Sequence, residues 1–462
     1  MKVPFKQPHL LAYIIFKACL DRFWKIPGMQ NSISLTSHVC KLMEKMVVQR
    51  LKWYLEFHGL LDLKQSGFRA RRRTTDHILR LHDAVQKALA NKHNVLAVFI
   101  DIEKAYDMVN KTVLLSKLLK LGINGEMWRF IQSFLSRRTF QVRVGSSFSG
   151  VKVSANGTPQ GSILSPILFS IMINDISRHV LSPSALYADD FCFWESGGDI
   201  KLLEERCKES LSKVATWCIN SGFRISPAKS AAVLFTRKRK PPSVRLALAT
   251  VPIPLKKEYK YLGVTFQSNG MYTVHIQHVV DKCHKRLNMM RFLKGTSWGA
   301  SKSPLLSIYR CLMRSLLEYG MEAYFFSARS HVVPLAKLQN EALRLCTGAM
   351  RSTPTLCLQH ACNEMPLELK HHLLCSKYRA HLLTFPTHRA KTIIEDCWQE
   401  LFPDFDNFCS FNNWRPASGE CVAGSRRPSM VASPPQTGLL CFQIHATLRY
   451  HDNGAAFSVQ VG

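Results

Sequence analysis

The chain has 462 residues, of which 46% are hydrophobic and 20% are charged, so it should fold, and its length exceeds what one ordinary core can organise. Its 62 Lys and Arg residues against 32 Asp and Glu residues give a net charge of +30, which attracts polyanions and makes nucleic acid the leading partner. An anionic membrane surface is the competing interpretation, but no long basic amphipathic helix supports it, and no segment has the ~20 apolar residues that span a bilayer. We therefore expect no membrane partner.

Cysteine usage favours a reducing, intracellular setting, because the 15 cysteines are scattered without a CxxC pair. The nearest approach to a zinc site is a group of six side chains whose spacing matches no familiar zinc motif, so we expect helix-packing residues instead. These six are Cys357, His360, Cys362, His371, His372 and Cys375.

The first half of the chain predicts helices around one buried strand. The early apolar run HLLAYIIFKACL is interrupted by Lys17, which favours a packed helix over a signal peptide. Helical periodicity follows in residues 39–61 and 74–90, with a basic, Gly-containing loop between them. The apolar run in NVLAVFID predicts a buried strand that ends at Asp101, and residues 111–135 are again helical.

The second half predicts further strands and then helices only. Residues 140–162 alternate with period two, as in a hairpin, and residues 167–180 are helical. SALYADDFCFW (residues 184–194) has the character of a strand, a tight turn and a strand, with Asp189 and Asp190 at the bend. A helix ending at Gly222 and the short strands SAAVLF and YKYLGVTF follow. Helical periodicity then continues for more than a hundred residues beyond Ser268, before a Pro-, Gly- and Ser-rich segment.

Carboxylates at two strand ends suggest a metal site. If the strand that ends at Asp101 neighbours the turn at Asp189 and Asp190, three carboxylates converge, and hard oxygen ligands of this number suit Mg²⁺. Two such ions can activate an attacking hydroxyl and stabilise a leaving pyrophosphate. Each feature alone is more often a solvated turn or an ordinary strand end, so the hypothesis depends on their combination.

Seven ordered motifs resemble those of reverse transcriptases. The motifs usually lettered A to E are FIDIEKAYDMV, NGTPQGSILSPILFSIMINDI, LYADDFCFW, GFRISPAKSAAVLF and YKYLGVTF. Upstream, SISLTSHVCKLMEKMVVQRL and QSGFRARRRTTDHILRL resemble two fingers motifs of the non-LTR retrotransposon branch. The resemblance covers about residues 33–267, and the helices to about residue 383 look like the thumb side of the same elements.

This resemblance implies an α+β fold of the right-hand polymerase type, with fingers, a palm built on an antiparallel sheet and a helical thumb. The expected organisation is a truncated N-terminal segment (1–32), a reverse transcriptase domain (33–268), a helical thumb and connection region (269–390) and a loosely structured tail (391–462). The implied activity is RNA-directed DNA polymerisation from a primer 3′-hydroxyl with dNTPs and two Mg²⁺ ions, or Mn²⁺. The implied partners are an RNA template and a DNA primer or nicked target DNA, with the nucleus as the expected location after a cytoplasmic ribonucleoprotein stage.

The motifs also imply catalytic roles for particular residues. Asp101, Asp189 and Asp190 match the metal-binding carboxylates, and the main-chain carbonyl of Ile102 would be a further ligand. Lys229 matches a lysine that can protonate the departing pyrophosphate.

Further residues match nucleotide and primer sites. Tyr106 matches the aromatic residue that lies under the sugar and excludes a 2′-hydroxyl. The other nucleotide-site matches are Arg69, Arg72, Gln160 and Gly161. The primer-grip matches are Tyr261, Leu262 and Gly263.

The sequence departs from the family pattern in the fingers and at its ends. Arg71 and Arg73 stand where Gly and Ser are usual, and Asn31 and Ser32 replace an Arg-Pro pair. The endonuclease that usually precedes the polymerase has no room ahead of Ile33, so we expect a truncated open reading frame. A decayed, non-catalytic remnant that only binds RNA is the alternative hypothesis, and a group II intron maturase or a telomerase is a weaker one.

Overall fold

The computed structural model describes residues 37–384, apart from 137, 145, 249–250, 296–298 and 326, together with the backbone of 444–451 and 454–461. Two compact units divide the chain, Met1–Leu401 and Phe402–Gly462, and each is described by itself. The expected N-terminal segment, the start of the first fingers motif and the Pro-rich segment lie outside the described residues.

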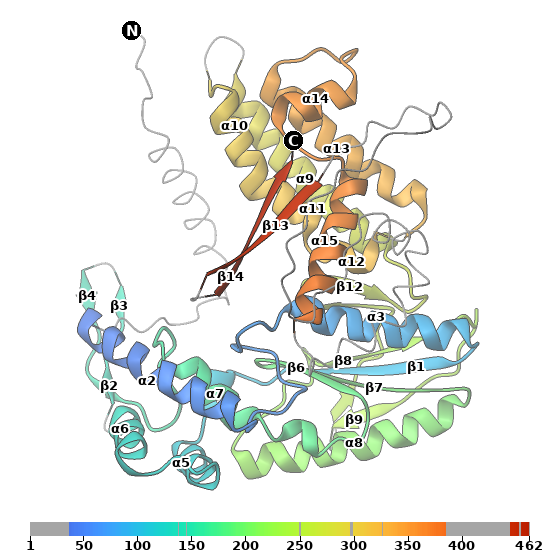
Figure 1. The fold of residues 1–462 in the computed structure, drawn as a ribbon. Coiled ribbons are helices and arrows are strands. Elements are labelled where there is room, and N and C mark those ends of the chain that lie inside the picture. The colour runs from blue at the N-terminus through green and yellow to red at the C-terminus, as the bar shows by residue number, and fades with distance from the viewer. Residues whose placement is uncertain are drawn as a thin grey trace, which may run out of the picture. The chain divides into compact units, whose positions relative to one another are not determined.

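A four-stranded antiparallel sheet occupies the centre of the first unit, in the order β6-β7-β1-β8 (Figure 1). The strands are β1 (Asn94–Ile100), β6 (Ser184–Tyr187), β7 (Asp190–Gly197) and β8 (Ala231–Phe235). As its apolar run predicts, β1 is buried along its whole length, and it pairs with both β7 and β8. Its register places Ile100 opposite Phe191, so Asp101 follows directly beside the first residues of β7.

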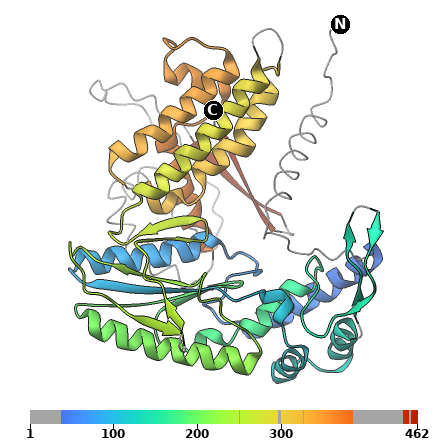
Figure 2. The ribbon, with the colours of Figure 1, turned by 180° about the vertical axis from the view of Figure 1, so that it is seen from behind.

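Helices cover both faces of this sheet (Figures 1 and 2). Alternate side chains of a strand point to opposite faces. Leu96, Val98 and Ile100 therefore pack with α7 (Ser165–Ile173) and α8 (Ile200–Ser221) on one face. On the other face, the side chains between them, such as Phe99, pack with α3 (Thr74–Ala90) and the helices that follow the palm.

The fingers combine helices with short strand pairs. Their helices are α2 (His38–Phe57), α4 (Ala105–Met108), α5 (Lys111–Lys120) and α6 (Gly125–Leu135). The expected hairpin appears as two ladders, β2 (Thr139–Phe140) with β5 (Lys152–Val153) and β3 (Arg143–Val144) with β4 (Ser147–Phe148). The helical stretch expected over residues 111–135 is observed as two helices, and Gly122 at φ 78° lies between α5 and α6.

Small strand pairs and a helical region complete the first unit. The pairs are β9 (Leu246–Leu248) with β10 (Val251–Ile253) and β11 (Glu258–Tyr261) with β12 (Val264–Gln267). A 3₁₀ turn, η1 (Ile176–Arg178), follows α7. The helices are α9 (Thr273–Lys294), α10 (Lys302–Ile308), the π-helix η2 (Tyr309–Arg314), α11 (Ser315–Glu318), α12 (Met321–Tyr324), α13 (Arg329–Thr347), α14 (Thr355–Cys362) and α15 (Leu367–Leu383). The helical character expected beyond residue 268 is thus observed as far as residue 383.

Part of the second unit is a hairpin of β13 (Ile444–His451) and β14 (Gly454–Val461). This hairpin differs from the loosely structured tail that the composition predicts for residues 391–462. The physical reason is visible in IHATLRYH, where apolar and polar residues alternate with the period of a strand.

The Cys and His residues near the end of the helical region are partly packing residues. Cys362, His371 and Cys375 are buried, and the Cys375 Sγ atom lies 3.3 Å from His371 Nε2. The His371 ring also stacks on Phe325, with centroids 4.6 Å apart. Among the described helices, none is long and apolar enough to cross a bilayer.

Three buried histidines predict acid sensitivity. Burial lowers the pKa of His77 to about 3 and the pKa values of His275 and His371 to about 4. The unfolded chain takes up these protons near pH ~6.5, so it binds more protons than the folded chain below that pH, and stability falls as pH falls. Between pH 7 and pH 5, we expect each histidine to cost about 2 kcal/mol of unfolding free energy, measured by urea denaturation.

The variant His275→Gln should reduce the loss of unfolding free energy between pH 7 and pH 5 by about 2 kcal/mol. The matched control is His284→Gln, because His284 is exposed. An unchanged pH slope in His275→Gln would contradict the assignment.

Candidate active site

The three predicted carboxylates converge at one end of the palm sheet. Asp189 and Asp190 follow β6, and the pairing of Tyr187 with Asp190 closes a tight turn in which Ala188 adopts φ 55°. Burial, then the charges of Asp189 and Asp101, raise the pKa of Asp190 to about 6. Burial also raises the pKa of Asp101, and Asp189 adds to this rise. Segments 88 residues apart (189 − 101) therefore meet, as the sequence predicts.

Lys229 is the cation beside these carboxylates. Its Nζ atom lies 3.9 Å from Asp101 Oδ2, and its side chain is 74% exposed. The loop that carries Lys229 is held against Asp101, because Ser226 N donates to the Asp101 carbonyl (2.9 Å) and Asp101 N donates to Ser230 Oγ (3.1 Å). The next residue, Ile102, is buried and forms a bridge with Ile225.

The three carboxyl groups are oxygen donors of the kind that hard divalent cations prefer, but their arrangement is open. The carboxyl groups lie close enough to one another that their charges contribute to the raised pKa values of Asp101 and Asp190, and a cation would relieve that repulsion. Within the described ranges, however, no group of three or more His, Cys, Asp or Glu side chains has an arrangement that could hold a metal ion. The aspartates thus lie near one another without forming a closed ligand set.

Tyr106 lies on α4 close to Asp189, whose charge adds to the effect of burial in raising the tyrosine pKa. Its ring stacks on Phe169 of α7, with centroids 4.9 Å apart and planes 22° apart. Its carbonyl accepts a hydrogen bond from Thr158 N (2.9 Å). The loop after residue 156 is therefore packed against the tyrosine, and a glycine is required there, since a Cβ on Gly157 would lie 2.8 Å from the Asp107 carbonyl oxygen.

Gln160 and Gly161 lie on this same loop, which leads into α7. Gly161 is exposed, with φ 107°, and Gln160 is half-buried. The Gln160 side chain makes no hydrogen bond to any other described residue, so its amide is available to a ligand.

The two fingers arginines have different environments. Arg69 is saturated by protein acceptors: Glu56 (2.6 and 2.8 Å), the Asp62 carbonyl (2.7 Å) and the Gln65 carbonyl (3.1 Å). Arg72 is half-buried and makes no hydrogen bond within the described part of the chain. Burial, then the neighbouring Arg69, lower its pKa.

The basic loop that carries these arginines is attached to the catalytic turn. Ser66 N donates to the Leu186 carbonyl of β6 (2.9 Å), and Gly67 packs so closely on Ala188 that no side chain would fit there. Arg71, where the family pattern usually has glycine, adopts φ 61°, a conformation that favours glycine.

The three residues that the motifs predict for the primer grip lie at the turn between β11 and β12. Leu262 (φ 44°) and Gly263 (φ 87°) form its two left-handed positions, and Tyr261 is buried against Phe99. The Tyr319 hydroxyl donates to the Leu262 carbonyl (2.6 Å) and lies 3.2 Å from Thr74 Oγ1 of α3.

Sequence reasoning missed two residues that hold the site. Tyr319 is distant in sequence from the turn that it contacts, so no local pattern marks it. Glu44 carried a signal that could have been used, because it shares a helical face with the buried Val48, Leu51 and Leu55. A charged residue on an apolar face indicates a specific partner.

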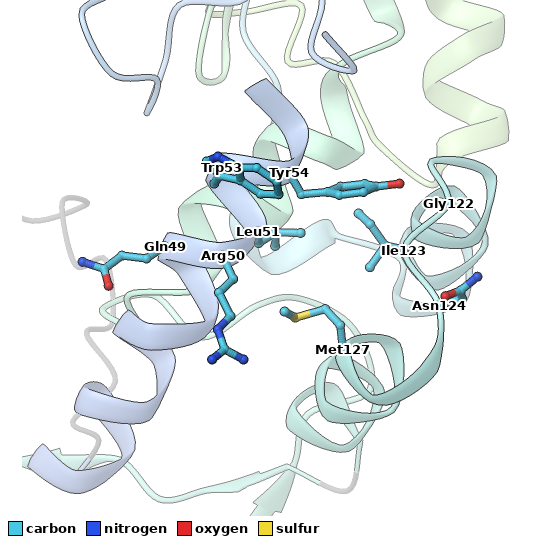
Figure 3. A pocket seen from close by; sticks show the side chains of 9 residues that line it. All are labelled: Gln49, Arg50, Leu51, Trp53, Tyr54, Gly122, Ile123, Asn124 and Met127. Carbon is cyan, nitrogen blue, oxygen red and sulfur yellow. The ribbon is translucent and has the colours of Figure 1, made fainter. Parts of the chain in front are cut away.

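A cavity of about 560 Å³ lies apart from these residues, between α2 and the α5–α6 connection (Figure 3). Trp53 and Tyr54 line it on one side and Ile123 and Met127 on the other. None of the residues that the sequence predicts for the site lines this cavity.

The three aspartates lie at one end of an antiparallel sheet, and comparison with known proteins gives the family of the chain. The family model "Reverse transcriptase (RNA-dependent DNA polymerase)" matches residues 27–266, more than half of the chain, and the chain belongs to this family. Curated relatives narrow the class to non-LTR retrotransposons, which confirms the identification made from the motifs.

One relative is the RNA-directed DNA polymerase from mobile element jockey of Drosophila melanogaster, 28% identical over 369 residues, which are 78% of this chain and 40% of that protein. The corresponding protein of Drosophila funebris is 28% identical over 325 residues, or 68% of this chain and 35% of that protein. The chain thus spans less than half the length of these relatives.

Among solved structures, telomerase from Candida tropicalis with a fragment of telomeric RNA matches with a TM-score of 0.37 and 12% identity, covering 76% of this chain and 56% of that one. An apo telomerase from the same organism, truncated from its C-terminal domain, gives a TM-score of 0.33 and 14% identity, covering 58% and 48% of the two chains.

Proposed function

We propose that this chain is an RNA-directed DNA polymerase that extends a primer 3′-hydroxyl with dNTPs. The observation that carries the proposal is the convergence of Asp101, Asp189 and Asp190 at one end of an antiparallel palm sheet, in a chain of the reverse transcriptase family. Two Mg²⁺ ions, or Mn²⁺, held by these carboxylates and the Ile102 carbonyl, would supply activation of the 3′-hydroxyl and stabilisation of the leaving pyrophosphate.

The surrounding residues have proposed roles that follow from their exposure and contacts. Lys229, exposed and 3.9 Å from Asp101, would donate a proton towards the departing pyrophosphate. Arg72, whose guanidinium makes no hydrogen bond to a described residue, would contact the triphosphate. Arg69 would instead hold the basic loop in place through its hydrogen bonds to Glu56. Tyr106 would lie under the sugar, with Gln160 and Gly161 beside the base pair.

The proposed partners are an RNA template and a DNA primer or nicked target DNA. The net charge of +30 favours polyanion binding, and synthesis primed on chromosomal DNA would occur in the nucleus. The decisive experiment is primer extension on an RNA template with dNTPs and Mg²⁺. Extended product supports the proposal; salt-sensitive RNA retention without product would leave only an RNA-binding remnant.

Tyr319 provides a test of the primer grip. The variant Tyr319→Phe removes the hydroxyl that holds the Leu262 carbonyl, while keeping the ring that packs on Gly263. One hydrogen bond is worth about 1 kcal/mol, so we expect KM for primer–template to rise about fivefold with little change in kcat.

Steady-state extension at varied primer concentration measures this effect. Thr74→Ala, which removes the more distant of the two contacts, is the control and should have a smaller effect. A Tyr319→Phe enzyme with unaltered primer KM would show that the turn does not depend on this bond.

A further inference from the structure

Glu44 is a fully buried acidic residue that the proposed chemistry does not use. It lies on α2 with 0% of its surface exposed, and it forms no ion pair with a described residue. Its Oε2 atom accepts three hydrogen bonds, from Ser162 Oγ (2.6 Å), Ile163 N (2.7 Å) and Leu164 N (3.2 Å). Its Oε1 atom faces Cys40 Sγ at 3.3 Å.

These three donors occupy the short link between the Gln160–Gly161 loop and α7. The first amides of a helix have no partner within the helix, and Leu164, the N-cap of α7, supplies no side-chain cap. Ser162 Oγ accepts hydrogen bonds from Leu164 N (3.1 Å) and Ser165 N (3.4 Å), so Glu44 caps this helix start together with Ser162, from a helix more than a hundred residues earlier in the chain. Its carboxyl oxygen is also well placed for the positive end of the α7 dipole.

The chain segment that carries Glu44 also reaches the catalytic turn. After α2, the Asp62 amide donates to Asn174 Oδ1 just beyond α7 (2.7 Å), and Ser177 Oγ donates to Asp62 Oδ2 (2.6 Å). Gly67 then packs directly on Ala188. Residues 44–67 thus contact the loop of Gln160 at one end and the turn of Asp189 at the other.

We propose that Glu44 is a positioning residue, which holds the Gln160–Gly161 loop at a defined distance from the catalytic aspartates and so sets the affinity for the incoming nucleotide. This inference rests on the proposed polymerase function. A positioning role predicts that loss of the Glu44 carboxyl group changes nucleotide affinity. A purely structural role predicts a change in folding stability with nucleotide affinity unchanged.

A pair of substitutions separates the two roles. Because all three loop donors converge on one oxygen, Glu44→Gln can present its amide oxygen to them and its NH₂ group to Cys40. Glu44→Ala removes the acceptor and leaves Ser162 Oγ and Ile163 N without a partner for their hydrogens, while Leu164 N keeps only its bond to Ser162 Oγ. Lys45→Ala, an exposed neighbour on the same helix, is the matched control.

The experiment uses the full chain and has two readouts. Primer extension should show that Glu44→Ala raises KM for dNTP about tenfold while kcat changes less than about threefold, with Glu44→Gln restoring KM to within about threefold of wild type. Hydrogen exchange should show faster exchange of the Ile163 and Leu164 amides in Glu44→Ala, with protection of β1 unchanged. Lys45→Ala should match wild type in both readouts.

Three outcomes would overturn the inference: an unchanged dNTP KM, an unchanged exchange rate at Ile163 and Leu164, or a uniform loss of protection throughout the chain. If Glu44→Ala does not fold, Ser162→Ala removes one donor to Glu44 together with the acceptor of the Leu164 and Ser165 amides, and it must raise the dNTP KM in the same direction. If the wild-type chain extends no primer, the proposed function fails by itself, and hydrogen exchange still decides whether Glu44 holds the loop.

Discussion

Replacing Asp101 with Asn should lower primer extension about 10³-fold or more, while RNA binding stays within about twofold of wild type. The amide has the size of the carboxyl group but no negative charge, so it cannot serve as an anionic ligand for a divalent cation. It also leaves Lys229, 3.9 Å from the Asp101 carboxyl group, without its neighbouring anion. Single-nucleotide incorporation and filter retention of RNA measure the two effects separately.

Glu103→Gln is the matched control for this substitution. Glu103 is exposed, lies two residues after Asp101 and also raises its pKa, yet the proposed mechanism assigns it no part. This variant should extend primers like wild type. Normal polymerisation by Asp101→Asn would remove the carboxylate assignment altogether.

Asp190→Asn should be milder than Asp101→Asn. Asp190 is exposed at the turn, yet desolvation and two neighbouring carboxylates raise its pKa to about 6, so it carries its charge less readily than a free aspartate. Its charge also raises the pKa values of Tyr259 and Cys192, which places it next to the apolar face of the sheet. The expected order of activity is therefore Asp190→Asn above both Asp101→Asn and Asp189→Asn.

The positions of the aspartates at strand ends were predictable because local signals mark them, whereas the pairing of β1 with β7 that brings them together is a contact between distant segments. A run of apolar residues can only be a buried strand when both its faces are covered, and β1 is buried throughout. Such a strand must end where the chain becomes polar, which is Asp101. The tight turn between β6 and β7 is similarly marked by two adjacent carboxylates between apolar, aromatic strands.

The supports of the site were not predictable, because they are contacts between residues distant in sequence. No local pattern reveals that Glu44 binds residue 162, or that Tyr319 binds the turn at Leu262. The contact of Arg69 could not be predicted from its motif either, although its partner is closer in sequence. Its motif suggests a phosphate ligand, but the carboxylate that it binds, Glu56, lies one helical segment earlier, and only the folded loop brings the two together.

Tyr106→Ala should admit ribonucleotides, lowering the preference for dNTP over rNTP about 100-fold. In the wild-type chain, the ring stacks on Phe169, and the hydrogen bond from Thr158 N to the Tyr106 main-chain carbonyl fixes the backbone that carries the ring. If the nucleotide sugar lies against this ring, as proposed, the stacked ring leaves no room for a 2′-hydroxyl. Removing it opens that space without touching the carboxylates.

The ratio of kcat/KM for dNTP and rNTP measures the change. Tyr106→Phe keeps the stack on Phe169 and should retain the preference to within about threefold, because exclusion depends on the ring and not on its hydroxyl.

The inferred role of Glu44 leads to a second prediction about sugar selection. Phe169 belongs to α7, and Glu44 accepts a hydrogen bond at the start of this helix. Glu44→Ala should therefore lower the preference for dNTP over rNTP slightly, in the same direction as Tyr106→Ala. A Tyr106→Ala enzyme that still rejects ribonucleotides would show that another residue selects the sugar.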